Sequence, residues 1–217
     1  MSNGFLLLVP LLNELMIMSN RIGEIPDILM KVRFLLLPVV LTVLSCSSEL
    51  VRYYPGNYYP EDSIYQNKKL KFLITYDNNW QLWTDPVSMD PDSRKFARQL
   101  HKSGIELLFI GTTAEKYLGT RAIAVNLNEP AKEYAEYIRR LNLKDIQNDQ
   151  GLVEFTNGRV DMIKWTYEKS GYGFAEFFFN SGTFDIRIAF WTRKAFFKNF
   201  LPVFESIMGS LVLAEAS

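Results

Sequence analysis

Two hydrophobic periods alternate along the chain after residue 68, one typical of strands and the other of helices. Every second residue is apolar from Leu70 to Tyr76, which predicts a strand over 69–76 with one buried face. Between Ala131 and Leu141 apolar residues recur every three or four positions, with charged residues opposite, which predicts an amphipathic helix. The same criteria predict strands at 80–83, 105–112, 121–127, 152–156, 159–168, 174–179 and 183–192, and helices that begin at Asp90-Pro91 and near Phe196.

Local signals predict how some of these elements turn or end. Asn157 and Gly158 are the pair of residues that best fits a two-residue type I′ turn, so we expect a tight hairpin between 152–156 and 159–168. Pro202 predicts that the last helix is divided or kinked, because proline lacks the N–H that a helix interior needs.

The order of the predicted elements indicates an α+β fold: two strands, a helix, two strands, a helix, a four-strand meander and a final helix. Such strands form a mostly antiparallel sheet, with flanking helices on one or both faces. Three features resemble the PsbP/Mog1/DcrB-like family: Tyr76 followed four residues later by Trp80, the central amphipathic helix, and the ending from Phe204 to Leu211. The resemblance covers residues 69–214 and implies a PsbP/Mog1-like sandwich. It also implies a secreted or lipid-anchored accessory factor, and it transfers no site residues.

A further hydrophobic run lies near the N-terminus. Lys31 and Arg33 precede the apolar segment 34–44, which is followed by Ser45 and Cys46. As a helix this segment covers only about 17 Å, too short for a hydrocarbon core of about 30 Å, so it is typical of a secretory signal rather than a membrane span. It resembles a bacterial lipoprotein signal in which these four residues occupy the lipobox: Val43, Leu44, Ser45 and Cys46.

That resemblance implies that Cys46 becomes the first residue of the mature chain. Its thiol would carry a diacylglyceryl group and its new N-terminus a fatty acid such as palmitate, which together anchor the protein in the cell envelope. Ser47 and Ser48 stand after the cysteine in place of an acidic residue. By the sorting rule of the lipoproteins that the signal resembles, this implies the outer membrane, facing the periplasm, if the cell is Gram-negative. Two other interpretations stay open: an ordinary cleaved signal, and an uncleaved anchor helix with an incidental cysteine.

The signal divides the chain into segments. We expect translation to start at Met30, which makes 1–29 a spurious N-terminal extension, followed by the signal peptide at 30–45. Residues 46–68 are expected to form a tether, since they carry proline and glycine without sustained periodicity, and 69–214 to form a single α+β domain. The alternative for the extension is a real hydrophobic helix that forms a hairpin with the apolar run of the signal.

Composition narrows the choice of function. Lys and Arg together number 24, and so do Asp and Glu, so the net charge is zero and nothing indicates a nucleic-acid partner. Because Cys46 is the single cysteine, no disulfide within the chain is expected, which suits an oxidising envelope compartment.

Candidate catalytic and metal-binding residues are few. His101 is the single histidine and is interpreted as a solvated helix residue, since no nucleophile motif accompanies it. Asp85, Asp90 and Asp92 lack the spacing of an EF-hand loop, and turn and helix-cap chemistry explains them better. The loop after the strand 105–112 lacks the residues of phosphate-binding and dinucleotide-binding loops, although glycines and threonines flank it: Gly111, Thr112, Thr113, Gly119 and Thr120. We therefore predict no enzyme activity, no cofactor, and no catalytic or metal-ligating residue.

Two functions fit these observations. The first is a non-enzymatic accessory or partner-binding module that is held on a membrane by its lipid and binds an envelope protein. The alternative is a carrier or chaperone for a hydrophobic small molecule or lipid. A closed apolar cavity would favour the carrier, whereas a filled core with an exposed apolar patch would favour the partner-binding module.

The carrier hypothesis depends on an aromatic-lined groove. Phe177, Phe178 and Phe179 break the alternation of their strand, so at least one ring must face away from the side that meets the helices. The other expected lining residues are Trp165, Tyr167, Trp191 and the phenylalanines of 196–204.

Overall fold

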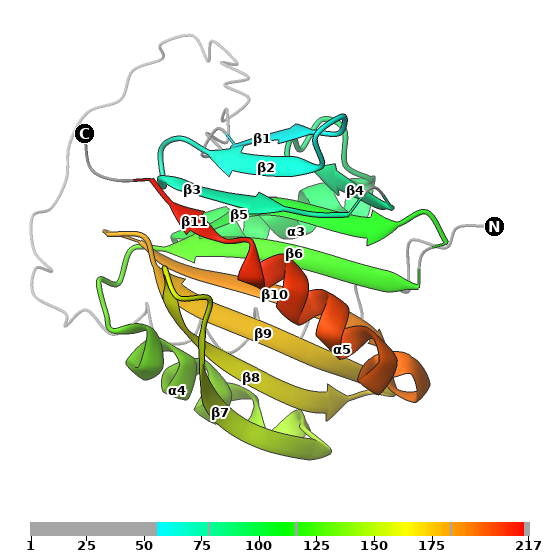
Figure 1. The fold of residues 1–217 in the computed structure, drawn as a ribbon, viewed down its shortest axis with the longest axis vertical. Helices are drawn as coiled ribbons and strands as arrows, with labels where there is room; N and C mark the ends of the chain where they lie inside the picture. Colours follow the sequence, from blue (N-terminus) through cyan, green and yellow to red (C-terminus); the bar gives the residue numbers. More distant parts are fainter. Residues whose placement is uncertain (1–55, 78, 116, 183, 215–217) are drawn as a thin grey trace, which may run out of the picture.

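The computed structural model describes residues 56–77, 79–115, 117–182 and 184–214 (Figure 1). Cys46 and the segments 1–29 and 30–45 lie outside these residues, as does the first part of the predicted tether. The assignments of signal, extension and lipidation therefore stay predictions.

A seven-stranded antiparallel sheet forms the centre of the domain, in the order β4-β5-β6-β10-β9-β8-β7. The strands follow the alternating pattern of the sequence. They are β4 (Trp80–Trp83), β5 (Ile105–Thr113), β6 (Leu118–Val125), β7 (Asn148–Thr156), β8 (Asp161–Lys169), β9 (Tyr172–Asn180) and β10 (Asp185–Arg193). The β6–β10 pair joins the part of the sheet that precedes the central helix to the meander that follows it.

A smaller antiparallel sheet, in the order β1-β2-β3-β11, packs on one face of the large sheet (Figure 1). Its strands are β1 (Gly56–Tyr59), β2 (Ile64–Asn67), β3 (Phe72–Thr75) and β11 (Val212–Leu213). The tether predicted at 46–68 is therefore wrong for 56–67, where β1 and β2 form a hairpin. Tyr65 of β2 is fully buried, and its ring packs edge-on against Phe109 with centroids 4.6 Å apart. The hairpin supplies core side chains, although its strands do not alternate apolar with polar residues.

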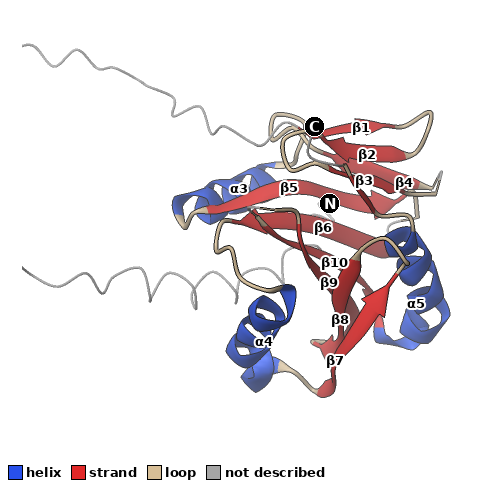
Figure 2. Cartoon of the chain, turned by 60° about the vertical axis from the view of Figure 1, so that its left-hand side comes forward, coloured by secondary structure: helices blue, strands red, loops and turns tan. Residues whose placement is uncertain are grey.

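Helices cover both faces of the large sheet (Figure 2). On one face lie α3 (Pro91–Lys102) and α4 (Ala131–Asn142), the latter followed by a 3₁₀ turn, η1 (Leu143–Asp145). On the other face α5 (Lys194–Gly209) lies beside the small sheet. Phe178 packs beneath α3 and α4, in a cluster with Tyr134 and Ile138 (the α3/α4 cluster). Phe177 and Phe179 pack on the opposite face, in a cluster with Phe204 and Met208 (the α5 cluster). One of the three rings thus faces away from the other two, as predicted. The predicted α+β class, with a mostly antiparallel sheet and flanking helices, is confirmed.

The predicted type I′ hairpin is wrong, because β7 and β8 are joined by four residues rather than two. Thr156 pairs directly with Asp161, and Asn157 lies in the loop instead of closing a two-residue turn. Its side-chain oxygen accepts hydrogen bonds from the N–H groups of Arg159 and Val160, at 3.0 and 2.9 Å, while its amide donates to Leu211 O at 2.8 Å. Asn157 therefore joins the loop to the C-terminal end of α5.

Pro202 does not divide the last helix. α5 continues through it from Lys194 to Gly209, with the proline on the solvent side. Lys198, whose carbonyl loses its usual N–H partner, is also exposed, so water can solvate that carbonyl. Burial of Phe204 and Met208 against the sheet stabilises the continuous helix.

Candidate functional site

The acidic residues considered above as a possible calcium site, Asp85, Asp90 and Asp92, lie in a turn and at the start of a helix. Asp90 caps α3, accepting hydrogen bonds from the N–H groups of Asp92 and Ser93 at 3.0 and 3.1 Å. Asp85 accepts the N–H of Val87 at 2.8 Å in the preceding turn. The cap and turn interpretation is thus confirmed. Across the part of the chain that the structure describes, no three His, Cys, Asp or Glu side chains are grouped to hold a metal ion.

His101 is only partly solvated. Its Nδ1 lies 2.8 Å from Glu106 Oε1, so the last turn of α3 is linked to the start of β5. The pair lies where the chain turns from helix to strand through Gly104, whose φ of +71° suits a glycine after a helix end. This contact therefore stabilises the turn between α3 and β5.

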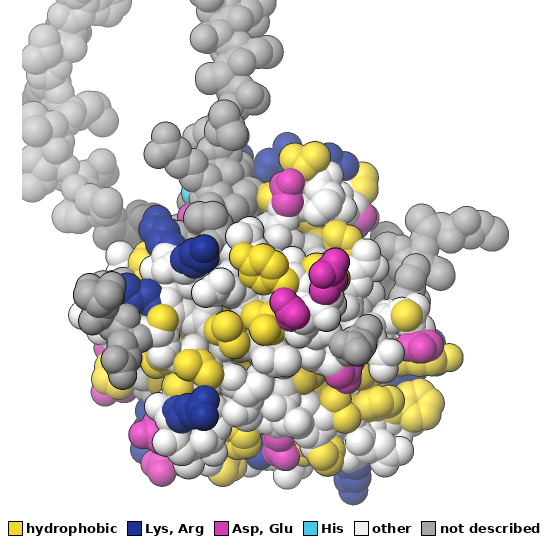
Figure 3. All heavy atoms as spheres, turned by 45° about the horizontal axis from the view of Figure 1, so that its top comes forward, with side chains coloured by type: hydrophobic (Ala, Val, Ile, Leu, Met, Phe, Trp, Pro, Cys, Tyr) yellow, Lys and Arg dark blue, Asp and Glu magenta, His cyan; other side chains and the backbone are white. Residues whose placement is uncertain are grey.

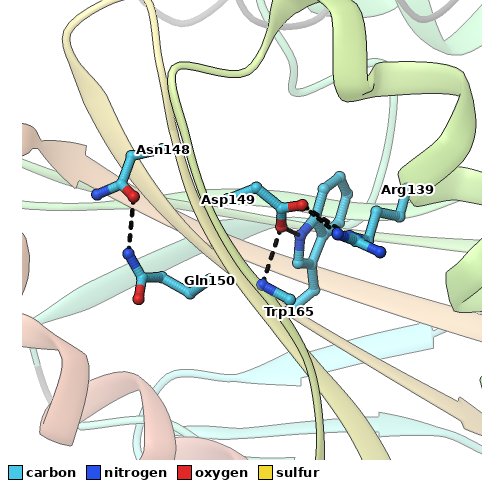
Figure 4. Close-up of polar contacts among 6 residues, drawn as sticks. Arg139, Asn148, Asp149, Gln150 and Trp165 are labelled. Atoms are coloured by element: carbon cyan, nitrogen blue, oxygen red, sulfur yellow. Dashed lines mark hydrogen bonds and ion pairs between the residues drawn. The ribbon is translucent and has the colours of Figure 1, made fainter.

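A polar cluster centres on Asp149, where β7 bulges (Figure 4). Arg139 of α4 directs both its Nε, at 2.8 Å, and a terminal nitrogen to Asp149 Oδ2. The indole Nε1 of Trp165 donates to Asp149 Oδ1 at 2.9 Å, and so does the N–H of Gly151. The bulge requires Gly151 at φ +77°, a conformation that glycine adopts without strain. Asp149 therefore joins α4, β7 and β8.

The lowered pKa of Asp149 fits a structural role better than a role in proton transfer. Burial raises the pKa of the Asp149 carboxyl, but the hydrogen bonds from Arg139, Trp165 and Gly151 outweigh this and lower the pKa to about 2. A catalytic base functions best with a pKa near the working pH. Asp149 is thus held as a carboxylate that fixes the edge of the sheet.

A second polar cluster lies fully inside the domain, on the α3/α4 face of the sheet. Arg187 of β10 forms a two-point ion pair with Glu176 of β9: its Nε donates to Oε2 and a terminal nitrogen to Oε1, each at 2.7 Å. The hydroxyl of Tyr167 also donates to Glu176 Oε1 at 2.7 Å. The Arg187 and Glu176 side chains are 2% and 0% exposed, so no substrate reaches them in this conformation.

The aromatic residues do not form the single groove that the carrier hypothesis expected. Trp165, Tyr167 and Trp191 pack in the α3/α4 cluster, whereas Phe200 and Phe204 of α5 pack on the opposite face of the sheet. The sheet lies between the two sets, so they cannot enclose one ligand. A hollow of about 510 Å³ does open to solvent between β3 and α5, lined by Thr75, Tyr76, Asp77, Pro202, Val203, Ser206, Ile207 and Ser210.

Two exposed aromatic rings lie together at one end of the sheet. Tyr117, in the turn that leads into β6, is 56% exposed, and Phe196, in the first turn of α5, is 42% exposed. Their ring centroids are 6.5 Å apart at an interplanar angle of 64°. The two residues are far apart along the chain, so no local pattern predicts the pair. The sequence does place Phe196 in the phenylalanine-rich segment 196–204. Its exposure depends on the register of the helix, which the sequence pattern did not predict.

Comparison with known proteins gives a fold-level likeness only. No family model matches the chain, and no curated protein matches it. Among solved structures it is similar to cyanobacterial PsbP (CyanoP) from Synechocystis sp. PCC 6803, with 10% sequence identity and a TM-score of 0.49 over 70% of this chain and 93% of that chain. It is also similar to a protein from Bacteroides thetaiotaomicron VPI-5482, with 15% identity and a TM-score of 0.39 over 67% of this chain and 46% of that chain.

PsbP is the family name that the sequence motifs indicated, but identities and scores at this level assign neither a partner nor an activity. No helix among the described residues is long and apolar enough to cross a membrane. The α+β class rests on the strand order and pairing of the chain itself, and membership of the PsbP/Mog1/DcrB-like family stays a prediction.

Proposed function

We propose that this chain is a non-enzymatic partner-binding module of the cell envelope, held on a membrane by a lipid on Cys46. If the cell is Gram-negative, the membrane is the outer one and the domain faces the periplasm. The observation that carries the binding role is the exposed aromatic pair, Tyr117 and Phe196. Aromatic residues are enriched at protein interfaces, because they bury a large area at a small cost in conformational entropy.

The backbone beneath the pair is fixed before any partner arrives. Thr192 Oγ1 donates to the carbonyl of Tyr117 at 2.9 Å, which ties the β5–β6 turn to the end of β10. The N–H of Lys194 donates to Gly171 O at 2.9 Å, which ties the start of α5 to the β8–β9 turn. A surface that is ordered in the free protein loses less conformational entropy on binding.

The pair lies far from the point at which the described chain begins. Gly56 pairs with Asn67, which lies opposite Phe72 of β3. The ring of Phe72 contacts Phe179, with centroids 5.5 Å apart, and Phe179 pairs with Ile186 near the start of β10. Tyr117 instead lies at the end of β10, about six residues or roughly 20 Å along the strand. These are opposite ends of the strands in Figure 1. A domain tethered through Gly56 therefore presents the aromatic pair away from its anchor.

A carrier function has less support. Rings and aliphatic side chains fill both faces of the large sheet, and the hollow between β3 and α5 is open rather than enclosed. This arrangement matches the filled core and exposed apolar patch that favour a partner-binding module.

Site-specific photocrosslinking in intact cells tests the binding role. We expect a photoreactive phenylalanine analogue at position 196 to give a discrete adduct on illumination, because a partner covers this ring. The matched control places the analogue at Leu143, which is 41% exposed on η1 and lies outside the pair. Tyr117→Ala should weaken the adduct at 196. No adduct at 196, or the same adduct from both positions, would contradict partner binding at the pair.

The anchor has an independent test. Cys46→Ser should lower the mass of the mature protein by the attached lipid and release the domain from the membrane fraction. An unchanged mass together with unchanged fractionation would show that Cys46 carries no lipid.

A further inference from the structure

A cluster of lysines lies where the described chain begins. The turn between β2 and β3 carries three exposed lysines, Lys68, Lys69 and Lys71, around the buried Leu70. Asn67, the residue before the turn, pairs with Gly56, the first described residue. The lysines and the point of attachment to the preceding chain are therefore neighbours in space.

The structure holds this turn in one conformation. The side-chain oxygen of Asn67 accepts the N–H of Leu70 at 2.9 Å, and its amide donates to the hydroxyl of Tyr65 at 3.1 Å. The carbonyl of Lys71 accepts the N–H of Ala214 at 2.7 Å. Because Leu70 is fixed in the core, the charged side chains on both sides of it must project from the surface.

Acidic residues are placed at the other end of the small sheet. Glu61 and Asp62 are exposed in the β1–β2 turn, and exposed Asp77 follows β3 where the N–H of Tyr76 bonds to Ser63 O at 2.7 Å. The two ends of the β1–β2 hairpin are separated by about 10 Å. Figure 3 shows a similar division on the face that carries the small sheet, with basic side chains (dark blue) to the left of a central apolar group and acidic ones (magenta) to its right.

We propose that the Lys68–Lys71 turn binds the anionic headgroups of the membrane that carries the lipid anchor. This inference rests on the proposed anchor at Cys46. Ten residues, from Cys46 to Pro55, link the anchor to Gly56 and span at most about 35 Å, so the turn stays within reach of the headgroups. Attraction of the lysines and repulsion of Glu61, Asp62 and Asp77 orient the domain with its basic end on the membrane and the aromatic pair away from it.

The orientation is measurable with fluorescent probes on single introduced cysteines, because Cys46 is the only native thiol. Asn57→Cys places a probe beside the basic turn, and Asn199→Cys places one near the start of α5; both residues are exposed. The purified mature protein is reconstituted into phosphatidylcholine vesicles with or without phosphatidylglycerol, and a headgroup-labelled lipid quenches nearby probes. We expect phosphatidylglycerol to increase quenching at residue 57 but not at residue 199, and high salt to reverse the increase.

The triple variant Lys68→Gln, Lys69→Gln and Lys71→Gln should return quenching at residue 57 to its value in neutral vesicles. Each lysine close to an anionic leaflet contributes roughly a fivefold factor, so the equilibrium constant for contact of the turn with the headgroups should fall by about 100-fold. The charge-matched control removes three exposed cations elsewhere: Arg140→Gln, Lys144→Gln and Lys198→Gln. It should keep most of the quenching.

Two results would overturn the inference: equal quenching at residue 57 in both kinds of vesicle, or an equal loss in the control variant. The mass of the purified protein reports separately whether Cys46 carries lipid. The same quenching series on the Cys46→Ser chain, added to preformed vesicles, still measures the headgroup contact. Failure of the anchor and failure of the lysine contact are thus distinguishable.

Discussion

The two faces of the large sheet are buried in different ways. The face beneath α5 and the small sheet is packed by rings and aliphatic side chains, such as Phe190 stacked on Phe204 with centroids 5.1 Å apart. The face beneath α3 and α4 encloses the ion pair of Glu176 and Arg187, hydrogen-bonded to Tyr167. Apolar packing depends on volume, whereas a buried ion pair depends on the presence of both partners.

The two faces should therefore differ in how well they tolerate substitutions. An apolar face can repack around a changed side chain, at a cost set by the cavity or overlap that results. The ion pair fixes the register of β9 against β10, because its two-point geometry requires Glu176 and Arg187 to stay diagonal neighbours. We therefore expect the α3/α4 face to be the less tolerant of single substitutions.

The largest expected effect comes from removing one partner of the ion pair. Glu176→Leu leaves Arg187 buried without its carboxylate and should lower the free energy of unfolding by about 3–5 kcal/mol. The double variant Glu176→Leu with Arg187→Met should recover all but about 1–3 kcal/mol, since apolar replacement of both charges is often neutral but the Tyr167 hydroxyl loses its acceptor. Urea unfolding followed by tryptophan fluorescence measures both. If the single and double variants lose equal stability, packing rather than charge governs this face.

A pair of glycines compares how the two faces accept added volume. A Cβ at Gly119 would overlap the ring of Trp191, which is buried on the α3/α4 face. A Cβ at Gly173 would overlap the ring of Phe197, a residue of α5 that packs on the opposite face. Each Gly→Ala change should cost about 1–3 kcal/mol. Gly119→Ala should cost more, because Trp191 is buried and Phe197 is half-exposed. Gly209→Ala is the control: it has open space around it and should change stability by no more than about 1 kcal/mol. Thermal unfolding ranks the three variants, and a larger loss from Gly173→Ala would reverse the comparison.

The sequence predicted the long strands and the helices because their hydrophobic periods persist over many residues. The strand predicted at 105–112 is β5, Ile105–Thr113, and the helix predicted after Pro130 is α4, Ala131–Asn142. It did not predict β1 and β2, since neither Gly56–Tyr59 nor Ile64–Asn67 alternates apolar with polar residues. Only the pairing of β2 with β3 shows that this hairpin belongs to the sheet.

The polar clusters depend on contacts that no local pattern encodes. Asp149 meets Trp165 because β7 pairs with β8 through a bulge, and it meets Arg139 because α4 packs across that edge. Tyr117 and Phe196 approach through the β6–β10 pairing. No local pattern singles out Asp149, Arg139 or Tyr117, because strand register and helix packing bring these residues to their partners. The predicted lipidation at Cys46 is different, since a signal peptide is recognised as a linear pattern.

The Asp149 cluster should make the α3/α4 face sensitive to acid. Because the folded pKa of Asp149, about 2, lies below its ordinary value, its contribution is present above pH 4 and is lost as the pH falls toward 2. The loss should reach at most about 2–3 kcal/mol, since each unit of pKa shift corresponds to about 1.4 kcal/mol. Asp149→Asn should remove this part of the pH dependence, so the stability difference between variant and wild type should shrink from pH 5 to pH 2. A difference that stays constant over this range would contradict the assignment.

The smallest effect on stability should accompany the largest effect on binding. Phe196 is exposed, so Phe196→Ala should change the free energy of unfolding by less than about 0.5 kcal/mol. Phe204→Ala, in the same helix but fully buried, should cost about 3–5 kcal/mol. Denaturant unfolding of both variants, combined with crosslinking from position 117, separates the roles of the two rings. Phe196→Ala should abolish the adduct in a fully folded protein, because it removes half of the exposed pair without touching either buried face. If Phe196→Ala destabilises the domain as much as Phe204→Ala does, the ring belongs to the core and its exposure carries no functional meaning.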